Sequence, residues 1–314
     1  MPIFTKQSSS GHTLDPYRGL SHPAKLLYLG LNTLNNHCPK PWIKQPFHVQ
    51  PFTLSSPNHL FPALKPHDSP SRKLCNLFWM DLPWQEIHEH LNGQIHSFDI
   101  GCGNGNYGPF LDQHSGQRLA SYTGIDVEEL ANWKTLQTER PGFYRFHRFQ
   151  GKDIRPFFSE ETNFIISQSA LEHIPEDVTF FEQLNEFIEA RKQPTIQVHL
   201  FPAAKTMHLY PFHGIRQYTP KTIATLLRPF DQAHTTFDVY SLGGQASIEM
   251  HKKFLFSGIF LKTPDRRKSE LAAYEEAGKR ALLKDLQDKD TGNASFYALI
   301  IQSYLKHPLS PVSK

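Results

Sequence analysis

A short apolar segment that runs directly into a glycine-rich turn is the feature that most constrains this fold. Residues 95–100 have the length and the apolar content of a buried strand, and glycines follow at 101, 103 and 105. Glycine lets the backbone turn sharply and approach a ligand closely. The helix expected after the turn offers free N–H groups to an anionic group. The segment therefore predicts a nucleotide-like ligand at the carboxyl end of a strand.

Apolar and amphipathic segments alternate from about residue 69 onward. This alternation predicts an α/β fold with a mostly parallel sheet and helices on both faces. Strands are expected at 95–100, 121–126, 143–149, 163–167, 195–201, 236–241 and 295–303, and helices at 106–114, 128–137, 176–191 and 220–227.

Prolines distinguish the first part of the chain from the rest. Twelve of the 24 prolines lie in residues 1–90, and they recur every few residues between Pro39 and Pro70. Because proline fixes φ and lacks an N–H donor, this part is expected to be an extended arm with one short helix near 23–35. The predicted organisation is an arm at 1–68, a main domain at 69–305 with an insertion at 242–293, and a tail at 306–314.

Composition argues against several classes of partner. The net charge is only +3, whereas proteins that bind nucleic acid through phosphates usually carry a larger basic excess. Mean hydropathy is −0.48, and no apolar run approaches the roughly 18 residues of a membrane span. Three cysteines without paired spacing suit a reducing compartment. We therefore expect a cytoplasmic protein with no nucleic-acid or membrane partner.

The glycine turn itself admits two interpretations. Gly103, Gly105 and Gly108 fit the GxGxxG pattern of dinucleotide-binding proteins, with Asp126 as a ribose ligand. However, Asp99 stands two residues before Gly101, and a carboxylate at that place would repel a pyrophosphate. The segments that follow distinguish the two interpretations.

The segment from Asp99 to Gly105 resembles the first motif of class I S-adenosylmethionine (SAM) methyltransferases. Three later segments, each at the end of an expected strand, are similar to further motifs of that family, and the four occur in the family's order. The resemblance covers residues 69–305 and implies SAM as cofactor. It also implies a Rossmann-like, seven-stranded sheet whose last strand is antiparallel. The three later segments are Tyr122–Val127, Phe149–Ile154 and Asn163–Ile174, the last of which contains Leu-Glu-His-Ile.

The resemblance also implies contacts with the cofactor. Asp99 is expected to bind the α-amino group, Asp126 the ribose hydroxyls and Asp153 the adenine amino group, with Ile154 as an apolar wall. Arg72, in the segment upstream of the first strand of the main domain, is expected to pair with the SAM carboxylate. The remaining expected cofactor contacts are Gly101, Cys102, Gly103, Asn104, Gly105, Val127, Ser167 and Gln168.

Two histidines are the candidates for catalysis. His173 follows the fourth expected strand, and an imidazole has a suitable pKa to accept the proton of a hydroxyl acceptor. His213 belongs to a polar cluster after the fifth strand, where His, Arg and Tyr residues suit a polar acceptor. The other interpretation is that His173 only frames the cofactor and that the cluster is a solvated loop. The expected substrate contacts are His208, Arg216 and Tyr218.

No metal site is expected from the sequence. His88 and His90 flank Glu89, but side chains two residues apart diverge on a helix, and no third ligand is evident.

The predicted function is SAM-dependent methyl transfer to a small-molecule or glycan acceptor, at oxygen. After the fourth strand the chain lacks the Pro-Pro and Pro-Cys signatures of nucleic-acid methylating relatives. Two alternatives remain open at this point: an NAD(P)-dependent oxidoreductase that uses the glycine loop, and a SAM-binding protein without turnover.

Overall fold

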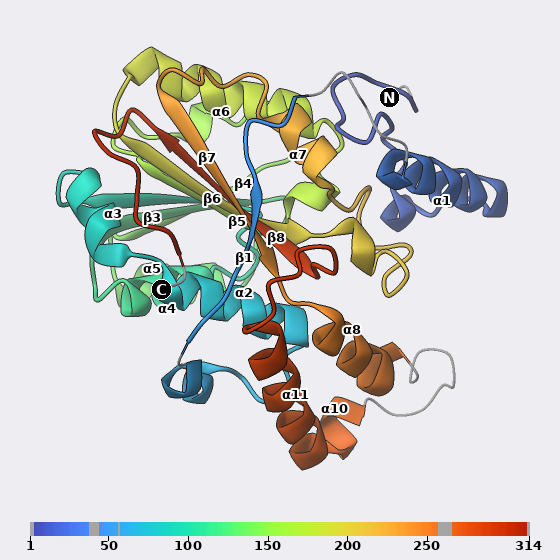
Figure 1. Cartoon of the computed structure of the whole chain (residues 1–314). Coiled ribbons are helices and arrows are strands. Elements are labelled where there is room, and N and C mark those ends of the chain that lie inside the picture. Colours follow the sequence, from blue (N-terminus) through green and yellow to red (C-terminus); the bar gives the residue numbers. More distant parts are fainter. Residues whose placement is uncertain (1–2, 38–43, 56, 257–265, 313–314) are drawn as a thin grey trace.

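One mixed sheet of eight strands forms the centre of the molecule (Figure 1). The computed structural model describes residues 3–37, 44–55, 57–256 and 266–312. The strand order is β1-β7-β8-β6-β5-β2-β3-β4, and every neighbouring pair is parallel except the two pairs that β8 makes. The strands are β1 (Val49–Pro51), β2 (Ile95–Ile100), β3 (Leu119–Asp126), β4 (Tyr144–Arg148), β5 (Phe164–Gln168), β6 (Thr195–Pro202), β7 (Thr235–Leu242) and β8 (Phe296–Ser303).

The sheet confirms the predicted Rossmann-like α/β class and its antiparallel strand, which is β8. The predicted number of seven strands is wrong by one, because the arm contributes β1, which pairs in parallel with β7. β1 is only three residues long and ends at Pro51, so it shows no alternating pattern. Its place at the edge of the sheet suits a proline, since an edge strand has one side without ladder hydrogen bonds.

Helices cover both faces of the sheet. Successive residues of the fully buried strand β5 face opposite sides, so Phe164 and Ile166 join one apolar core and Ile165 joins the other. α2, α3, α4 and α5 contribute to the first core, and α6 and α7 contribute to the second. These helices are α2 (Pro70–Asp81), α3 (Trp84–His90), α4 (Tyr107–His114), α5 (Asn132–Glu139), α6 (Asp177–Arg191) and α7 (Pro220–Leu226).

The direction of the chain reverses at β2. From β2 the chain proceeds to β3 and β4 on one side, and it then crosses to β5 on the other side of β2. In open α/β sheets ligands bind in the crevice outside the carboxyl ends of the strands at such a reversal. The crevice here lies between the segments that follow Ile100 and Gln168.

The predicted insertion at 242–293 is helical over most of residues 245–256 and 266–285, and its residues 257–265 lie outside the described part. The carboxylate of Asp285 accepts hydrogen bonds from the backbone N–H groups of Gly244, Ala246 and Ser247, and it thereby caps the start of α8. Phe254 and Tyr274 lie in a small separate apolar cluster. The elements are α8 (Gln245–His251), a π-helix (Lys252–Phe256), α10 (Arg266–Ser269) and α11 (Leu271–Asp285).

The arm lies beside the sheet and adds β1 to its edge (Figure 1). Its helix α1 (His22–His37) extends the helix expected near 23–35 by a few residues, and β1 follows. Prolines 39 and 41 of the arm lie outside the described residues. Across the described ranges, no helix combines the length and apolar character needed to cross a membrane.

Candidate functional site

The glycine turn after β2 has the conformation that its sequence requires. Gly101 has a φ of +71°, and a Cβ atom there would lie 2.4 Å from the Cβ of Ala170. The turn therefore packs directly against the segment that follows β5. Gly103 has a φ of +51°, but a Cβ there would meet nothing within 4 Å. The backbone at Gly103 thus faces open space that a ligand can occupy.

Two residues from the next strand and helix hold this turn in place. Asp126, at the end of β3, accepts a hydrogen bond from the N–H of Gly103 at 2.8 Å through one oxygen and from the N–H of Val127 at 2.7 Å through the other. The indole Nε1 of Trp133 donates to the carbonyl oxygen of Gly103 at 2.7 Å. The carboxylate of Asp126 and the glycine turn therefore form one preorganised unit.

A cavity of about 480 Å³ lies over the crevice between β2 and β5. Its volume falls in the range of small-molecule sites. It reaches from Asp126 on one side to His173 on the other, so a single ligand in it can contact both. Its lining residues are Arg18, Ile100, Gly101, Ile125, Asp126, Val127, Phe149, Gln150, Gly151, Lys152, Ser169, Ala170, His173, Ile174, Pro175, Glu176, Thr179 and Phe180.

A second cavity of about 340 Å³ lies on the other side of Gly101, and Arg72, Asp99 and Gln168 line it. Ser69 caps α2 by accepting a hydrogen bond from the N–H of Arg72, which fixes that residue in the first turn. The Arg72 guanidinium donates to the hydroxyl of Tyr107 at 2.8 Å. Gln168 accepts a hydrogen bond from the indole of Trp79, while its buried Nε2 has no hydrogen-bond partner within the described ranges. The remaining lining residues are Lys65, Asp68, Asn76, Gly101, Cys102, Gly103, Asn104, Asn106, Tyr107 and Phe110.

Asp99 is the most strongly perturbed carboxyl group of this cavity. Burial raises its pKa to about 7, against the hydrogen bond that the Tyr122 hydroxyl donates to it. A cationic group beside Asp99 would favour the ionised form and offset that burial. Asp99 is therefore suited to bind an ammonium group.

These features fit SAM, the cofactor that the resemblance implies. Gly103 leaves room for close approach, and Asp126 presents a carboxylate to the cavity where ribose hydroxyls would lie. On the other side of Gly101, Asp99 suits the ammonium group of SAM. Arg72 and the unpartnered Nε2 of Gln168 suit its carboxylate. The two cavities share Gly101, so an elongated ligand passing over the turn can occupy both.

Four of the predicted cofactor residues lie elsewhere. Gly105 belongs to the turn but faces the protein, since a Cβ there would lie 2.7 Å from the ring of Phe146. Asp153 is exposed and pairs with Arg155 at 2.8 and 2.9 Å. Ile154 is fully buried in the second apolar core, and Ser167 is buried and bonded to His199. Neither cavity is lined by any of the four. Phe149, Gln150, Gly151 and Lys152, which precede Asp153, line the larger cavity in their place.

The two predicted catalytic histidines lie together. The rings of His173 and His213 contact each other, with their centroids 5.0 Å apart. Between them lies Glu172, whose Oε1 is 3.9 Å from Nε2 of His173 and 3.6 Å from Nε2 of His213. The hydroxyl of Tyr17, from the arm, is 2.7 Å from Nδ1 of His213. The sequence contains no local signal that would place Tyr17 there, because 196 residues separate the two.

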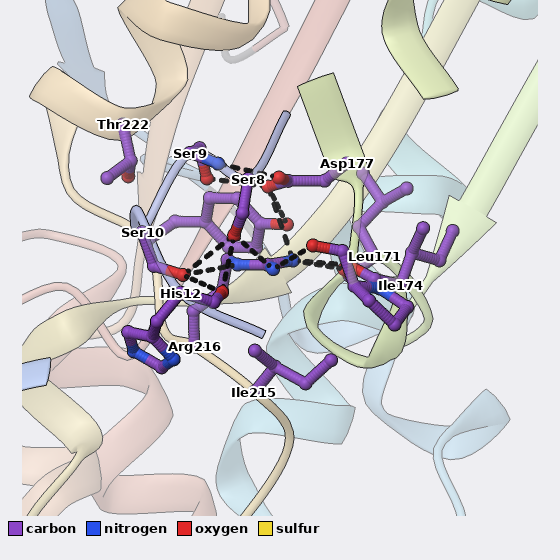
Figure 2. A network of polar contacts seen from close by, with 12 residues as sticks. Ser8, Ser9, Ser10, His12, Leu171, Ile174, Asp177, Ile215, Arg216 and Thr222 are labelled. Carbon is purple, nitrogen blue, oxygen red and sulfur yellow. Dashed lines mark hydrogen bonds and ion pairs between the residues drawn. The ribbon is translucent and has the colours of Figure 1, made fainter. Parts of the chain in front are cut away.

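Arg216 and Tyr218, the next two predicted substrate residues, lie in the interior of the structure. Both side chains are fully buried, and neither lines a cavity described above. The Arg216 guanidinium donates to the carbonyl oxygens of Ile174 and Pro175, with a longer contact to that of Leu171. Figure 2 shows it between these carbonyl groups and the arm. The Tyr218 hydroxyl donates to Asp177 at 3.1 Å.

Arg216 fastens the arm to the domain. Its side chain donates to the hydroxyls of Ser8 and Ser10, and it lies 3.3 Å from the carboxylate of Asp177. Asp177 in turn accepts hydrogen bonds from the backbone N–H and the hydroxyl of Ser9 (Figure 2). This buried network places the following segment of the arm, with Tyr17 and Arg18, beside the larger cavity.

His208, the third predicted substrate residue, is exposed and lines neither cavity. Burial and the charge of Lys252 lower its pKa. Arg18, Phe149 and Lys152 line the larger cavity without having been predicted to do so.

Comparisons with known proteins identify the central part of the chain. Residues 98–189 match a family model described as "Methyltransferase domain". The match indicates a methyltransferase domain in this part of the chain, in agreement with the prediction of a class I SAM-dependent methyltransferase. No curated protein sequence matches the chain.

Solved structures that resemble the chain have low identity to it. The [4+2]-cyclase SpnF has 11% identity and a TM-score of 0.46, with 97% of this chain and 98% of that chain covered. The plantazolicin methyltransferase BamL, solved with a triazolic desmethylPZN analog and SAH, has 14% identity and a TM-score of 0.41, with 68% and 77% covered. The Burkholderia thailandensis 1,6-didemethyltoxoflavin-N1-methyltransferase has 14% identity and a TM-score of 0.39, with 71% and 78% covered.

Proposed function

We propose that this class I SAM-dependent methyltransferase methylates an oxygen atom of a small-molecule or glycan-type acceptor. The observation that carries the proposal is the position of His173, which lines the same cavity as Asp126 and Gly101. A group that can remove a proton therefore lies within reach of the space assigned to the cofactor.

The cofactor supplies a methyl group on a positively charged sulfur, and attack by the acceptor oxygen breaks the carbon–sulfur bond and leaves a neutral thioether. The chain's own task is to hold both partners in line. Asp126 and the turn at Gly103 would hold the nucleoside, and Asp99 with Arg72 would hold the amino-acid end. These contacts fix the direction in which the methyl group points.

A hydroxyl acceptor must also lose its proton, and His173 is placed to take it. Burial lowers the pKa of His173, so the imidazole is neutral near pH 7 and has a free nitrogen to accept the proton. The proton moves from the acceptor oxygen to the imidazole as the new carbon–oxygen bond forms. The buried carboxylate of Glu172, 3.9 Å from Nε2 of His173, stabilises the positive charge that then develops.

The lining of the cavity supports a polar acceptor with an apolar part. Arg18, Lys152 and Glu176 contribute charged groups, while Phe149 and Phe180 contribute aromatic surface. Sugars and other hydroxylated metabolites combine these two characters.

The test is a turnover assay that measures formation of S-adenosylhomocysteine (SAH) over a panel of sugars, hydroxylated small molecules and amines. We expect turnover with hydroxyl acceptors, and a fall of about 10²- to 10⁴-fold in His173→Ala with SAH affinity unchanged. His307→Ala, at an exposed position, is the control. Transfer to amines alone, or full activity of His173→Ala, would contradict the proposal. Tight SAH binding without any turnover would favour the SAM-binding protein without catalysis.

A further inference from the structure

The group of Glu172, His173 and His213 has a composition that catalysis by a single base does not require. One ligand atom from each of the three residues lies within 4.8 Å of the other two. Two imidazoles and one carboxylate are a common protein ligand set for divalent transition metals. No metal was expected here from the sequence, because His213 lies far along the chain from Glu172.

The burial of Glu172 is the second observation. Its side chain has no exposure, and among the residues that the structure describes neither of its carboxylate oxygens has a hydrogen-bond partner. A buried carboxylate without a partner is costly, because it loses its hydration and gains nothing in return. Arg216, a buried cation on the same loop as His213, is already paired with Asp177. The site therefore lacks a positive charge at Glu172.

The backbone of residues 214–215 holds the loop that carries His213 close to Glu172. The N–H of Ile215 donates to the carbonyl oxygen of Glu172 at 2.7 Å. Gly214 has a φ of +69°, and a Cβ there would lie 2.9 Å from Cγ of Glu172. Only glycine permits such a close approach. α1 supports the loop from behind, since the Tyr28 hydroxyl donates to the carbonyl oxygen of Gly214 at 2.8 Å.

The arm fixes the orientation of the His213 ring. The hydroxyl of Tyr17 bonds to Nδ1, which leaves Nε2 directed at Glu172. Histidine ligands of metals are usually held in this manner, with the second ring nitrogen bonded to a neighbouring group. Tyr17 thus occupies the position of an outer partner of a metal ligand.

The distances suit an ion after a small movement. Ligand atoms about 2.1 Å from a tetrahedral ion lie about 3.4 Å apart. Oε1 of Glu172 is 3.6 Å from Nε2 of His213 and 3.9 Å from Nε2 of His173. Side-chain shifts of a few tenths of an ångström bring these two pairs into that range.

We propose that Glu172, His173 and His213 bind one divalent transition-metal ion of the zinc class, with its open coordination position directed into the larger cavity. The role of the ion in catalysis rests on the function proposed above; its binding does not. An acceptor hydroxyl that coordinates the ion forms a metal–oxygen bond and releases its proton to solvent water, because the ion lowers the hydroxyl pKa. In the metal-bound chain His173 is a ligand, and the ion takes over the role proposed above for the imidazole, which is to assist the loss of the hydroxyl proton.

The test uses the purified full chain, freed of metal with a chelator and titrated with zinc and with cobalt by calorimetry. We expect one ion per chain, and cobalt should produce visible absorption bands of a low-symmetry site. Glu172→Gln and His213→Ala should each weaken zinc binding by more than about 100-fold. His307→Ala is the matched control and should bind zinc like the parent chain.

Binding of SAH is measured on the same samples to separate the two proposals. Intact SAH binding in the variants shows that they are folded, so a loss of zinc binding then supports the site. Zinc binding that the variants leave unchanged, or no binding of either metal, would overturn the metal site while leaving the methyltransferase function untouched. Zinc binding without SAH binding in the parent chain would instead contradict the cofactor assignment alone.

Discussion

The two halves of the site are built in different ways. On the cofactor side, Asp126 bonds to Gly103 across 23 residues, and one strand–turn–helix unit supplies most of the contacts. On the acceptor side, Tyr17 bonds to His213 across 196 residues and Arg216 bonds to Ser8 across 208. The first half is therefore set by local geometry, whereas the second exists only once the arm, α1 and the loop after β6 have assembled.

The difference extends to electrostatics. Asp99, on the cofactor side, keeps a hydrogen bond from Tyr122 and has a pKa raised to about 7 by burial. The Glu172 carboxylate, on the acceptor side, is equally buried but has no hydrogen-bond partner in the described part of the chain. We propose that the ammonium group of the cofactor compensates the charge of Asp99 and that a metal ion compensates the charge of Glu172. The following variants test whether the two halves are as independent as this comparison implies.

The largest effect is expected for Arg216→Ala. It leaves Asp177 buried without its cation, and removing one partner of a buried pair costs about 3–5 kcal/mol of the free energy of unfolding. Denaturant unfolding measures the loss, and hydrogen exchange of residues 3–18 reports release of the arm. Arg155→Ala, which breaks the exposed pair with Asp153, is the control and should change the midpoint little. Equal effects of the two variants would show that the Arg216 network does not hold the arm.

Asp126→Ala should weaken SAH binding by about 100-fold, since two hydrogen bonds to a charged group are lost together with the support of Gly103. Calorimetry measures the affinity. Asp153→Ala is the matched control, because that carboxylate is exposed and lines neither cavity. A comparable loss in Asp153→Ala would restore the role in adenine binding that the resemblance assigned to it.

SAH affinity should depend on pH through Asp99. Its pKa of about 7 lies above the ordinary value, so the group is protonated below pH 7 and must lose its proton to bind an ammonium group. Affinity should therefore fall by up to about tenfold for each pH unit below 7 and level off above it. Calorimetry between pH 5.5 and 8.5, in steps of about half a unit, measures the slope. Asp99→Asn should bind more weakly and without this slope; an unchanged slope would exclude Asp99 as its origin.

Stability should show the opposite dependence in the protein without ligand. Because Asp99 is protonated in the folded chain at pH values where it is ionised in the unfolded chain, its contribution to stability falls as pH rises from about 4 to about 7. Comparison of unfolding midpoints of the parent and Asp99→Asn over that range isolates the contribution.

The smallest effect is expected for Tyr17→Phe, which removes only the hydroxyl bonded to His213 and keeps the ring contact with His173. One such hydrogen bond contributes about 1 kcal/mol, so turnover should fall about fivefold. SAH affinity should stay the same. Tyr304→Phe, whose hydroxyl bonds to Glu189 at a distant position, is the control. A change in SAH affinity would show that the two halves of the site are coupled.

Much of the fold was predictable from the sequence because its signals are local. The strand at 95–100 was predicted with its observed bounds, and the other six main strands were predicted to within two residues. Buried strands of a parallel sheet appear as short apolar runs, and helices between them repeat apolar residues at helical spacing. β1 was missed because three residues beside a proline carry no such pattern.

The acceptor side was less predictable because burial cannot be read from residue type. Arg216 and Tyr218 are residue types that often bind substrates. In the structure both are buried, where Arg216 donates to the carbonyl oxygen of Ile174 and Tyr218 donates to Asp177. Asp153 likewise has the expected residue type and place in the chain, but it pairs with its neighbour Arg155.

The sequence by itself determined the α/β fold, the glycine turn and the side of the sheet on which the cofactor site lies. Strand periodicity and glycine conformation act over a few residues, so they leave a readable pattern. Two features depended on the tertiary structure alone. One is the cluster formed by Tyr17, Glu172, His173 and His213, and the other is the set of hydrogen bonds between Arg216 and the arm. Those contacts join segments far apart in the chain, and they depend on which surfaces pack together once the core has formed.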